Sequence, residues 1–286
     1  MIDRLFLGIL LMLGFCVLAP LGDAMAKVLG ADMSVGFLVL VRFTVQAALL
    51  LPLVWLLKYP MPQGARLIRL TAFRTVLHIA GITLMFSSLQ YLELADAIAI
   101  AFVMPFIMLL LGKVYLNEDV GPHRLAACAV GFVGTLLVVQ PNFVQVGLPA
   151  LLPVGVAVVF ALFMLVTRAI AKDVDPIGLQ ALSGVMAVPA VGLAMILFPE
   201  TPLLAIKSIP DNAWLLLAIL GCMGTVAHLL MTWSLRFAPS TTLAPMQYLE
   251  IPVATVLGLL VFAQFPNAMA LAGIVLIMGA GLYMIH

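Results

Sequence analysis

Ser240-Thr-Thr-Leu-Ala-Pro-Met-Gln-Tyr-Leu-Glu-Ile-Pro-Val-Ala-Thr-Val-Leu-Gly-Leu-Leu-Val-Phe262 is the stretch that decides how this chain folds. It is long and apolar enough to cross a bilayer as a helix of about 20 residues, yet near its middle Glu250 lies between Pro245 and Pro252. A carboxylate at that depth is costly in lipid, so its side chain should face protein or water. The two prolines weaken the backbone hydrogen bonds around them, which is tolerated where a helix lines a cavity or packs on neighbours. The stretch therefore predicts one wall of a polar pathway through a membrane protein.

The composition of the whole chain agrees with a membrane location. Of the 286 residues, 65% are hydrophobic and 9% are charged, whereas soluble domains are about half apolar and about a quarter charged. The net charge of +1 and the lack of a basic run give no indication of a nucleic-acid partner. The three cysteines fall in apolar segments without the spacing of a disulfide frame or a metal site. We therefore expect no metal and no cofactor, and we expect the partners to be the lipid bilayer and a small-molecule substrate.

Apolar windows along the chain predict ten membrane spans joined by short connectors. The expected spans cover residues 5–28, 34–57, 70–91, 95–116, 123–140, 149–170, 176–198, 213–236, 241–263 and 267–285. The fold predicted from this pattern is an all-α membrane protein.

The positive charges predict the orientation, because cytoplasmic loops are enriched in Lys and Arg. On one side the connectors hold Arg4, Lys58, Arg66, Arg69, Lys113, Arg124, Arg168, Lys172 and Arg236, and on the opposite side they hold Lys27 and Lys207. Both termini are therefore predicted to be cytoplasmic, in a multi-pass protein of the cell's inner membrane.

Weak internal similarity indicates that the chain repeats itself. With one constant shift, Phe102 falls on Tyr248 and Gly112 on Gly258, and further matches run in the same order. Five spans in each copy would make the second copy insert upside down. Inverted repeats with a site between them near the midplane of the membrane are typical of transporters.

Several motifs carry a resemblance to a known family. They are Arg42-Phe43, Leu94-Ala-Asp-Ala, Met104-Pro105, Leu116-Asn-Glu118, Tyr248-Leu-Glu250, and Gly273, Gly279 and Gly281. With them the chain resembles the drug/metabolite transporter superfamily, EamA type, over essentially its whole length. Two positions depart from the family pattern: Ile251 follows the glutamate where a proline is usual, and Gln264 replaces a second glutamate.

The resemblance implies a fold and a mechanism. It implies ten transmembrane helices in two inverted five-helix repeats, residues 1–145 and 146–286, which move a small organic solute by alternating access. It does not name the cargo, because members of the family handle many metabolites.

The strongest candidate for a functional residue is Glu250. It is interpreted as a proton acceptor or as a counter-ion for a cationic group, and the alternative is a structural ion pair or a cap on freed backbone amides. Gln247 and Tyr248 precede it and share part of its surroundings. Tyr248 would suit a planar substrate, although packing alone would also explain its presence.

Arg74 and His78 are four residues apart, so they lie on one face of a helix. Arg74 would bind a carboxylate or phosphate of the substrate, pair with Glu250, or extend to the cytoplasmic headgroups. His78 is a proton relay or a hydrogen-bonded packing residue. By the repeat, His228 lies one turn from the counterpart of His78, so both histidines are expected to face the same central space, with His228 hydrogen-bonding or stacking there.

A second group of charges lies in the opposite half of the membrane. Arg42 lies too deep to reach the headgroups, so it needs a partner, and Asp23 is a candidate. Asp23 and Lys27 are four residues apart and also suit each other. The three residues are predicted to form a structural charge network or a gate whose pairs break and re-form between states.

Proline and glycine suggest where helices bend and touch. Pro105, Pro245 and Pro252 are expected to bend their helices. Gly131-x-x-Gly134 and the glycines that begin at Gly273 would allow close helix contact. We expect these two faces to support the bundle or to form a homodimer.

The function that best fits these patterns is transport of a small organic metabolite, with an anionic or zwitterionic cargo slightly favoured. An exporter of cationic or aromatic compounds is the alternative, and coupling to protons, exchange and passive movement stay open. A channel would show rings of like polar residues, and an enzyme would show a nucleophile motif or a metal motif, neither of which is present in the sequence. We therefore predict that the protein is not an enzyme.

Overall fold

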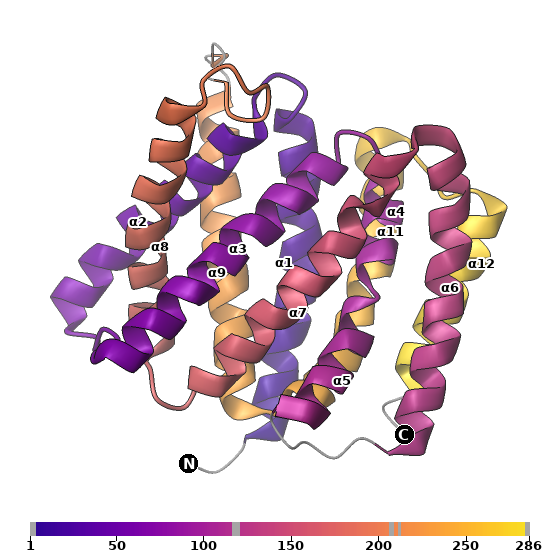
Figure 1. Ribbon diagram of the computed structural model, residues 1–286, viewed down its shortest axis with the longest axis horizontal. Helices are drawn as coiled ribbons and strands as arrows, with labels where there is room; N and C mark the ends of the chain where they lie inside the picture. Colours follow the sequence, from indigo (N-terminus) through magenta and orange to yellow (C-terminus); the bar gives the residue numbers. More distant parts are fainter. Residues whose placement is uncertain (1–3, 116–120, 206–208, 211–212, 284–286) are drawn as a thin grey trace.

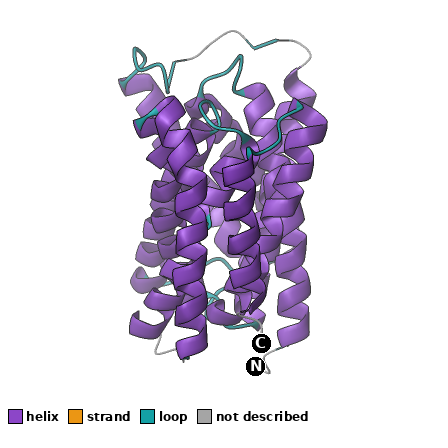
Figure 2. Ribbon diagram, turned by 90° about the vertical axis from the view of Figure 1, so that its right-hand side faces the viewer, coloured by secondary structure: helices purple, strands orange, loops and turns teal. Residues whose placement is uncertain are grey.

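The computed structural model describes residues 4–115, 121–205, 209–210 and 213–283, which form a bundle of helices (Figures 1 and 2). No strand occurs in these ranges. The elements are α1 Leu5–Leu29, α2 Val35–Leu57, α3 Ala65–Ser88, α4 Leu94–Ala101, α5 Met104–Tyr115, α6 Pro122–Val146, the 3-10 helix η1 Leu148–Leu151, α7 Leu152–Ile170, α8 Pro176–Leu197, α9 Ala213–Phe237, α10 Ser240–Leu243, the 3-10 helix η2 Ala244–Leu249, α11 Glu250–Phe262 and α12 Ala268–Tyr283.

Seven helices in the described ranges are long and apolar enough to cross a membrane. They are α1, α2, α3, α6, the continuous η1 and α7, α8 and α9. Three predicted spans take another form: α4 with α5, α10 with η2 and α11, and the shorter α12. The chain is therefore an all-helical, multi-pass membrane protein.

Two of the predicted spans are broken near their middles. Between α4 and α5 the helix is interrupted at Phe102 and Val103, and between α10 and α11 it narrows to the 3-10 helix η2. Pro105 and Pro245 occupy the second positions of α5 and η2, and Pro252 occupies the third position of α11. A proline in the first turn of a helix removes no helical hydrogen bond, because the first N–H groups of a helix have no acceptor within it. The prolines therefore lie just after the interruptions, in the first turn of the segments that follow.

The prediction that a span ends at residue 140 was wrong. Helix α6 continues through Pro141 to Val146. Beyond the proline, the Asn142 side chain donates to the Val138 carbonyl (2.9 Å) and to the Asp96 carboxylate (2.7 Å). The bond to Asp96 holds the last turns of α6 against α4. The prediction ended the span before Pro141 and could not take this contact between helices into account.

Four pairs of helices make the most extensive contacts in the bundle. Helix α1 packs on α9, α3 on α7, α2 on α8, and α6 on α12. The last pair lies at one side of Figure 1. A Cβ atom added to Gly134 would lie 2.8 Å from the Gly273 carbonyl oxygen, and one added to Gly131 would overlap the Phe106 ring. Gly131, Gly134 and Gly273 thus serve packing within the chain, as the alternative of structural support predicts. The homodimer stays a prediction.

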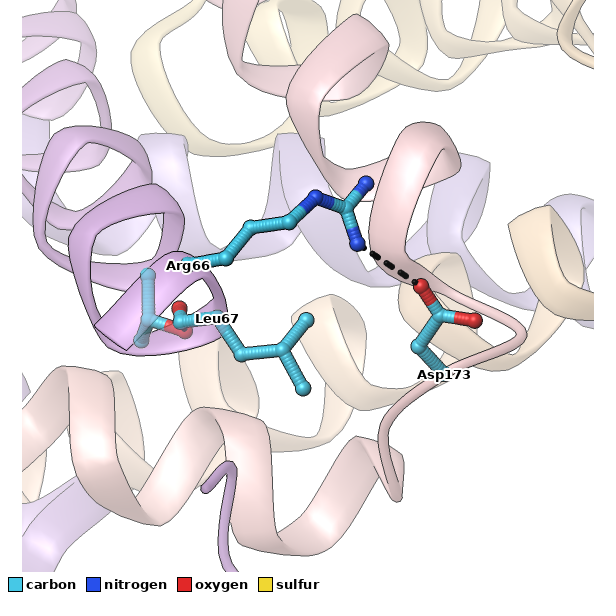
Figure 3. A network of polar contacts seen from close by, with 4 residues as sticks. Arg66, Leu67 and Asp173 are labelled. Atoms are coloured by element: carbon cyan, nitrogen blue, oxygen red, sulfur yellow. Dashed lines mark hydrogen bonds and ion pairs between the residues drawn. The ribbon is translucent and has the colours of Figure 1, made fainter. Parts of the chain in front are cut away.

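One end of the bundle carries an exposed ion pair. The start of α1 and the end of α12 lie at the same end (Figures 1 and 2). At that end Arg66, in the first turn of α3, points toward Asp173 in the turn after α7, with 3.4 Å between Nη1 and Oδ2 (Figure 3). Both side chains are at least half exposed, so this pair contributes little to stability.

Candidate functional site

A cavity of about 820 Å³, its opening included, lies between the helices. Its lining comes from α1, α2, α3, α4, α5, α7, α9 and α11, so segments far apart in the sequence surround one space. On α3 the lining residues begin at Gly81, in the C-terminal half, and on α7 they end at Phe160, in the middle of the helix. The cavity thus occupies the middle of the bundle and the half where α3 ends and α7 begins. Its size is within the usual range for small-molecule sites.

Arg42 and two histidines form one polar wall of this cavity. Arg42 Nη2 lies 2.8 Å from His228 Nδ1, and Arg42 Nη1 lies 3.4 Å from His78 Nε2. Because a guanidinium has donors and no acceptor, each of these ring nitrogens accepts from Arg42 in the tautomer that carries its proton on the other nitrogen. His228 Nδ1 also lies 3.1 Å from the Gly224 carbonyl oxygen, to which it would donate in the opposite tautomer. The other two ring nitrogens, His78 Nδ1 and His228 Nε2, have no hydrogen-bond partner among the described residues. The expectation that both histidines face one central space is met in part, since His228 lines the cavity and His78 lies directly behind it.

Gly224 makes this wall possible. A Cβ atom at this position would lie 2.9 Å from Arg42 Cζ and would also overlap Nε. The Gly224 carbonyl in turn accepts from Arg42 Nη2 at 3.4 Å. Helix α9 therefore needs a glycine here so that the guanidinium can reach His228.

Asp23 and Glu250 bring two carboxylates to the same cavity, from α1 and α11. Glu250 is the first residue of α11, is 9% exposed, and its Oε1 has no hydrogen-bond partner among the described residues. Asp23 is half-buried and forms no ion pair with Arg42 or Lys27 within the described ranges. In the described part of the chain, the structure thus shows no direct contact for the predicted pairs of Asp23, although Asp23 and Arg42 line the same cavity with opposite charges. The predicted charge network stays a prediction.

The rest of the lining is apolar and partly aromatic. The aromatic members are Phe15, Phe86, Phe102 and Phe160. Rings at several sides of a cavity with few polar groups favour a flat, partly apolar ligand that those groups orient. These phenylalanines were not predicted, because in an apolar sequence nothing distinguishes a phenylalanine that lines a cavity from one that packs in the core or faces lipid.

Arg74 does not reach this cavity. It is fully buried, its Nε donates to Thr167 Oγ1 at 2.8 Å, and its Nη1 donates to Ser183 Oγ at 3.0 Å. The guanidinium carbon lies 4.4 Å from the centre of the Phe163 ring. Pairing with Glu250 and extension to the headgroups, two of the alternatives for Arg74, are both wrong.

Three other predicted residues lie away from the cavity lining. Lys27 Nζ donates to the carbonyls of Leu89 and Leu92, at 2.8 and 2.5 Å. Gln247 is fully buried, with Nε2 3.4 Å from Met164 Sδ. Tyr248 stacks behind the cavity phenylalanines, 5.3 Å from the Phe102 ring.

Two glutamines that were not predicted as site residues connect α2, α8 and α9. Gln46 Nε2 donates to the Gln180 carbonyl at 2.7 Å, and Gln180 Nε2 contacts the His228 carbonyl and Thr232 Oγ1, each at 3.1 Å. Both glutamines are fully buried. The sequence did contain a signal for them. Each is an amide side chain in a largely apolar helix, and a buried amide needs hydrogen-bond partners.

The geometry thus provides a site for binding and orientation. Among the described residues, no group of three or more His, Cys, Asp or Glu side chains could hold a metal ion. The polar groups of the lining include Arg42, His228 and the two carboxylates of Asp23 and Glu250, and the rest of the lining is mostly apolar.

Comparison with known proteins identifies the family. The sequence profile of the EamA-like transporter family matches residues 6–140 and again residues 147–285. The chain belongs to the EamA-like transporter family. This agrees with the resemblance noted in the sequence, and the named relatives of this EamA-like chain are transporters, not enzymes.

Relatives with names handle two different metabolites. The riboflavin transporter of Brucella anthropi is 26% identical over 250 residues, which is 86% of either chain. The riboflavin transporter of Rhizobium johnstonii is 29% identical and covers 74% of this chain and 68% of its own length. The S-adenosylmethionine uptake transporter of Rickettsia bellii is 26% identical and covers 92% of this chain and 88% of its own.

A solved crystal structure has the same fold as this EamA-like chain. It superposes with a TM-score of 0.68 at 18% sequence identity, and the match covers 98% of this chain and 95% of that one. At this level of identity the likeness concerns the fold alone.

Proposed function

We propose that this protein takes up a small metabolite with a flat heteroaromatic ring, of the chemical class of riboflavin or the adenosyl group, by alternating access around the central cavity. The observation that carries the proposal is the cavity itself, whose lining combines four phenylalanines with the side chains of Asp23, Arg42, His228 and Glu250. Such a lining suits a flat ring whose edge carries both donors and acceptors.

The named relatives support this class of cargo. Riboflavin and S-adenosylmethionine differ in charge, but each has a flat nitrogen-containing ring system and a polar chain. In our proposal the aromatic side chains pack on the ring, Arg42 and His228 donate to its oxygen or nitrogen acceptors, and Asp23 and Glu250 accept from its N–H groups. The word uptake in the names of several relatives favours import.

The mechanism we propose uses two inverted repeats, residues 1–145 and 146–286. The family profile matches the chain twice, once in each of these parts. If α1, α2 and α3 of the first part correspond to α7, α8 and α9 of the second, the helix contacts are also symmetric. The contact of α1 with α9 matches that of α7 with α3, and the contact of α2 with α9 matches that of α8 with α3. Rocking of one part against the other would open the bundle at alternate ends.

The orientation follows from charge. The end of the bundle that holds Arg66 and Lys172 is richer in basic residues, so we place it, with both termini, in the cytoplasm. The cavity lies nearer to the opposite end, which would therefore face outward.

A carboxylate in the cavity supports coupling to protons. Glu250 faces the cavity with Oε1 unpartnered among the described residues, so it is free to exchange a proton or to bind a positive charge on the cargo. Export of cationic compounds is the second candidate, because Asp23 and Glu250 together place two acids in one apolar cavity.

Ligand-induced stabilisation of the purified protein in lipid nanodiscs tests the cargo class. Ligand that binds the folded state raises its apparent stability, by about 2.7 kcal/mol at a hundred times Kd. We expect riboflavin or S-adenosylmethionine to raise Tm, and Phe160→Ala, which removes a cavity ring, to weaken this shift. Phe132→Ala, at a half-exposed position on α6, is the matched control. A lack of any shift with both compounds, together with a shift caused by a cationic dye, would contradict the proposal and favour export of cations.

A further inference from the structure

Arg74 is a buried positive charge without a negative partner. Its side chain is fully buried, and in the described part of the chain no carboxylate lies within ion-pair distance of it. The groups that it contacts are the hydroxyls of Thr167 and Ser183 and the face of Phe163. Its Nη2 has no hydrogen-bond partner among the described residues. Neutral hydroxyls compensate a buried charge poorly, so this site is incomplete as it stands.

The position of Arg74 relates it to the cavity. It lies seven residues before Gly81, where the cavity lining on α3 begins, which is about 10 Å along a helix. A continuous stack of rings connects the two places. Phe163 lies 4.6 Å from His78, and His78 lies 4.3 Å from His228 at the cavity wall. Arg74 is thus on the far side of the histidine pair, in the half of the bundle that the cavity does not occupy.

Three helices meet at Arg74, and their arrangement indicates how the site would open. Arg74 lies on α3, Thr167 on α7 and Ser183 on α8, so the first belongs to one proposed repeat and the other two belong to the second. A movement that separates the repeats at this end would free the guanidinium and both hydroxyls together. The donors would then face a new space on the opposite side of the histidine pair.

We infer that Arg74, with Thr167 and Ser183, is a second binding station for the cargo, which receives a carbonyl, carboxylate or phosphate oxygen when the bundle opens at the end opposite the cavity. Arg42 would hold an acceptor group of the cargo while the cavity is open, and Arg74 would hold one after the histidine pair has separated. This inference rests on the proposed alternating-access function.

The charge preference of thiol labelling tests the station without any cargo. In a chain whose native cysteines are replaced by serine, Ser183→Cys puts a thiol beside Arg74, and Ala19→Cys puts one in the cavity. Each chain, in oriented membrane vesicles, is treated from either side with an anionic or a cationic methanethiosulfonate that does not cross the bilayer. We expect Ser183→Cys to react from the side opposite to that from which Ala19→Cys reacts. At this position the anionic reagent should react faster than the cationic one, and adding Arg74→Gln should lower the ratio of the two rates about tenfold.

Matched variants make this result specific. Adding Arg66→Gln, which removes a charge at the exposed end of the same helix, should leave the ratio unchanged. Should Ser183→Cys prevent folding, Thr71→Cys offers a thiol one turn from Arg74 at another buried position. The inference is wrong if the thiol beside Arg74 reacts from neither side while Ala19→Cys reacts normally, or if Arg74→Gln leaves the ratio unaltered.

Two-sided binding of riboflavin separates this inference from the proposed function. In oriented vesicles we expect Arg74→Gln to weaken binding about tenfold from the far side and to leave binding from the cavity side unchanged, with partial rescue by Arg74→Lys. A merely structural role would weaken binding from both sides equally. If the wild-type protein binds no riboflavin from either side, the proposed cargo fails, and the labelling ratio still decides the role of Arg74.

Discussion

His78 of α3 and His228 of α9 lie ring against ring, with 4.3 Å between their centroids and 31° between their planes. One guanidinium, that of Arg42 on α2, contacts both rings. Phe15 and Phe43 approach the pair edge-on, at 5.7 Å from His228 and 5.1 Å from His78. Three helices are therefore held together at the cavity wall by contacts that depend on which ring nitrogen accepts.

Replacing either histidine by phenylalanine keeps a ring of similar size and removes the acceptor for Arg42. A buried donor left without its partner costs about 1–3 kcal/mol. We therefore expect His78→Phe and His228→Phe each to lower Tm by several degrees in nanodisc melting experiments. His123→Phe, at an exposed position at the start of α6, should change Tm little. Unaltered melting of both cavity-wall variants would show that the contacts with Arg42 do not stabilise the fold.

Gly224→Ala places a methyl group against the Arg42 side chain, 2.9 Å from Cζ. The guanidinium must move away from His228, so we expect a lower Tm and about tenfold weaker binding of the cargo. Gly192→Ala is the matched control on α8, because no atom lies within 4 Å of the added carbon. There the exchange should be neutral or stabilising by up to about 1 kcal/mol. Equal effects of the two substitutions would contradict a specific role for Gly224.

The bond between Asp96 and Asn142, 2.7 Å long, joins α4 to α6. Both side chains are buried, and Asp96 Oδ1 has no hydrogen-bond partner among the described residues. Asn142→Ala removes the donor, and we expect it to cost about 1–3 kcal/mol.

A double-mutant cycle measures this interaction. Asp96→Ala in addition to Asn142→Ala should cost less than the sum of the two single changes, because the second change then leaves no partner unsatisfied. Additive changes in Tm would show that the two residues do not interact.

Lys27→Met distinguishes a structural lysine from a gate. Lys27 Nζ donates to two carbonyls in the turn that follows α3, those of Leu89 and Leu92. We expect Lys27→Met to lower Tm and to speed hydrogen exchange in this turn, since hydrogen bonds to charged groups contribute about 1.5–3 kcal/mol. A gate would give another result, namely slower uptake with an unchanged Tm.

Glu250→Gln tests how the cavity treats charge. The amide keeps the size of the side chain and removes its negative charge, so binding of S-adenosylmethionine, which carries a sulfonium, should weaken by about tenfold or more. Binding of neutral riboflavin should weaken less. Isothermal titration of the same preparation with both compounds provides the comparison, and an equal loss for the two ligands would assign Glu250 to the structure of the cavity wall instead.

The positions of the candidate residues show how far sequence reasoning reached. Glu250 was predicted as a site residue from the cost of a carboxylate in an apolar chain, and His228 from the repeat. Asp23 and Arg42 were predicted as part of a charge network or gate, and all four residues line the cavity. Gln247 and Tyr248, predicted beside Glu250, and Lys27, predicted beside Asp23, make contacts away from the lining. A buried polar group needs a partner wherever it is, so its presence indicates burial without specifying which space it faces.

By itself, the sequence determined that this is a helical, multi-pass membrane protein, because the low charge content and the long apolar runs allow no other way to satisfy the backbone. It also determined which polar residues must be buried. Only the tertiary structure decided that Arg42 reaches both histidines, that Arg74 lies behind them with hydroxyl partners, and that Gly134 meets Gly273 within the chain. These contacts join helices far apart in the sequence, and their geometry depends on how the helices pack, which local patterns of hydrophobicity do not encode.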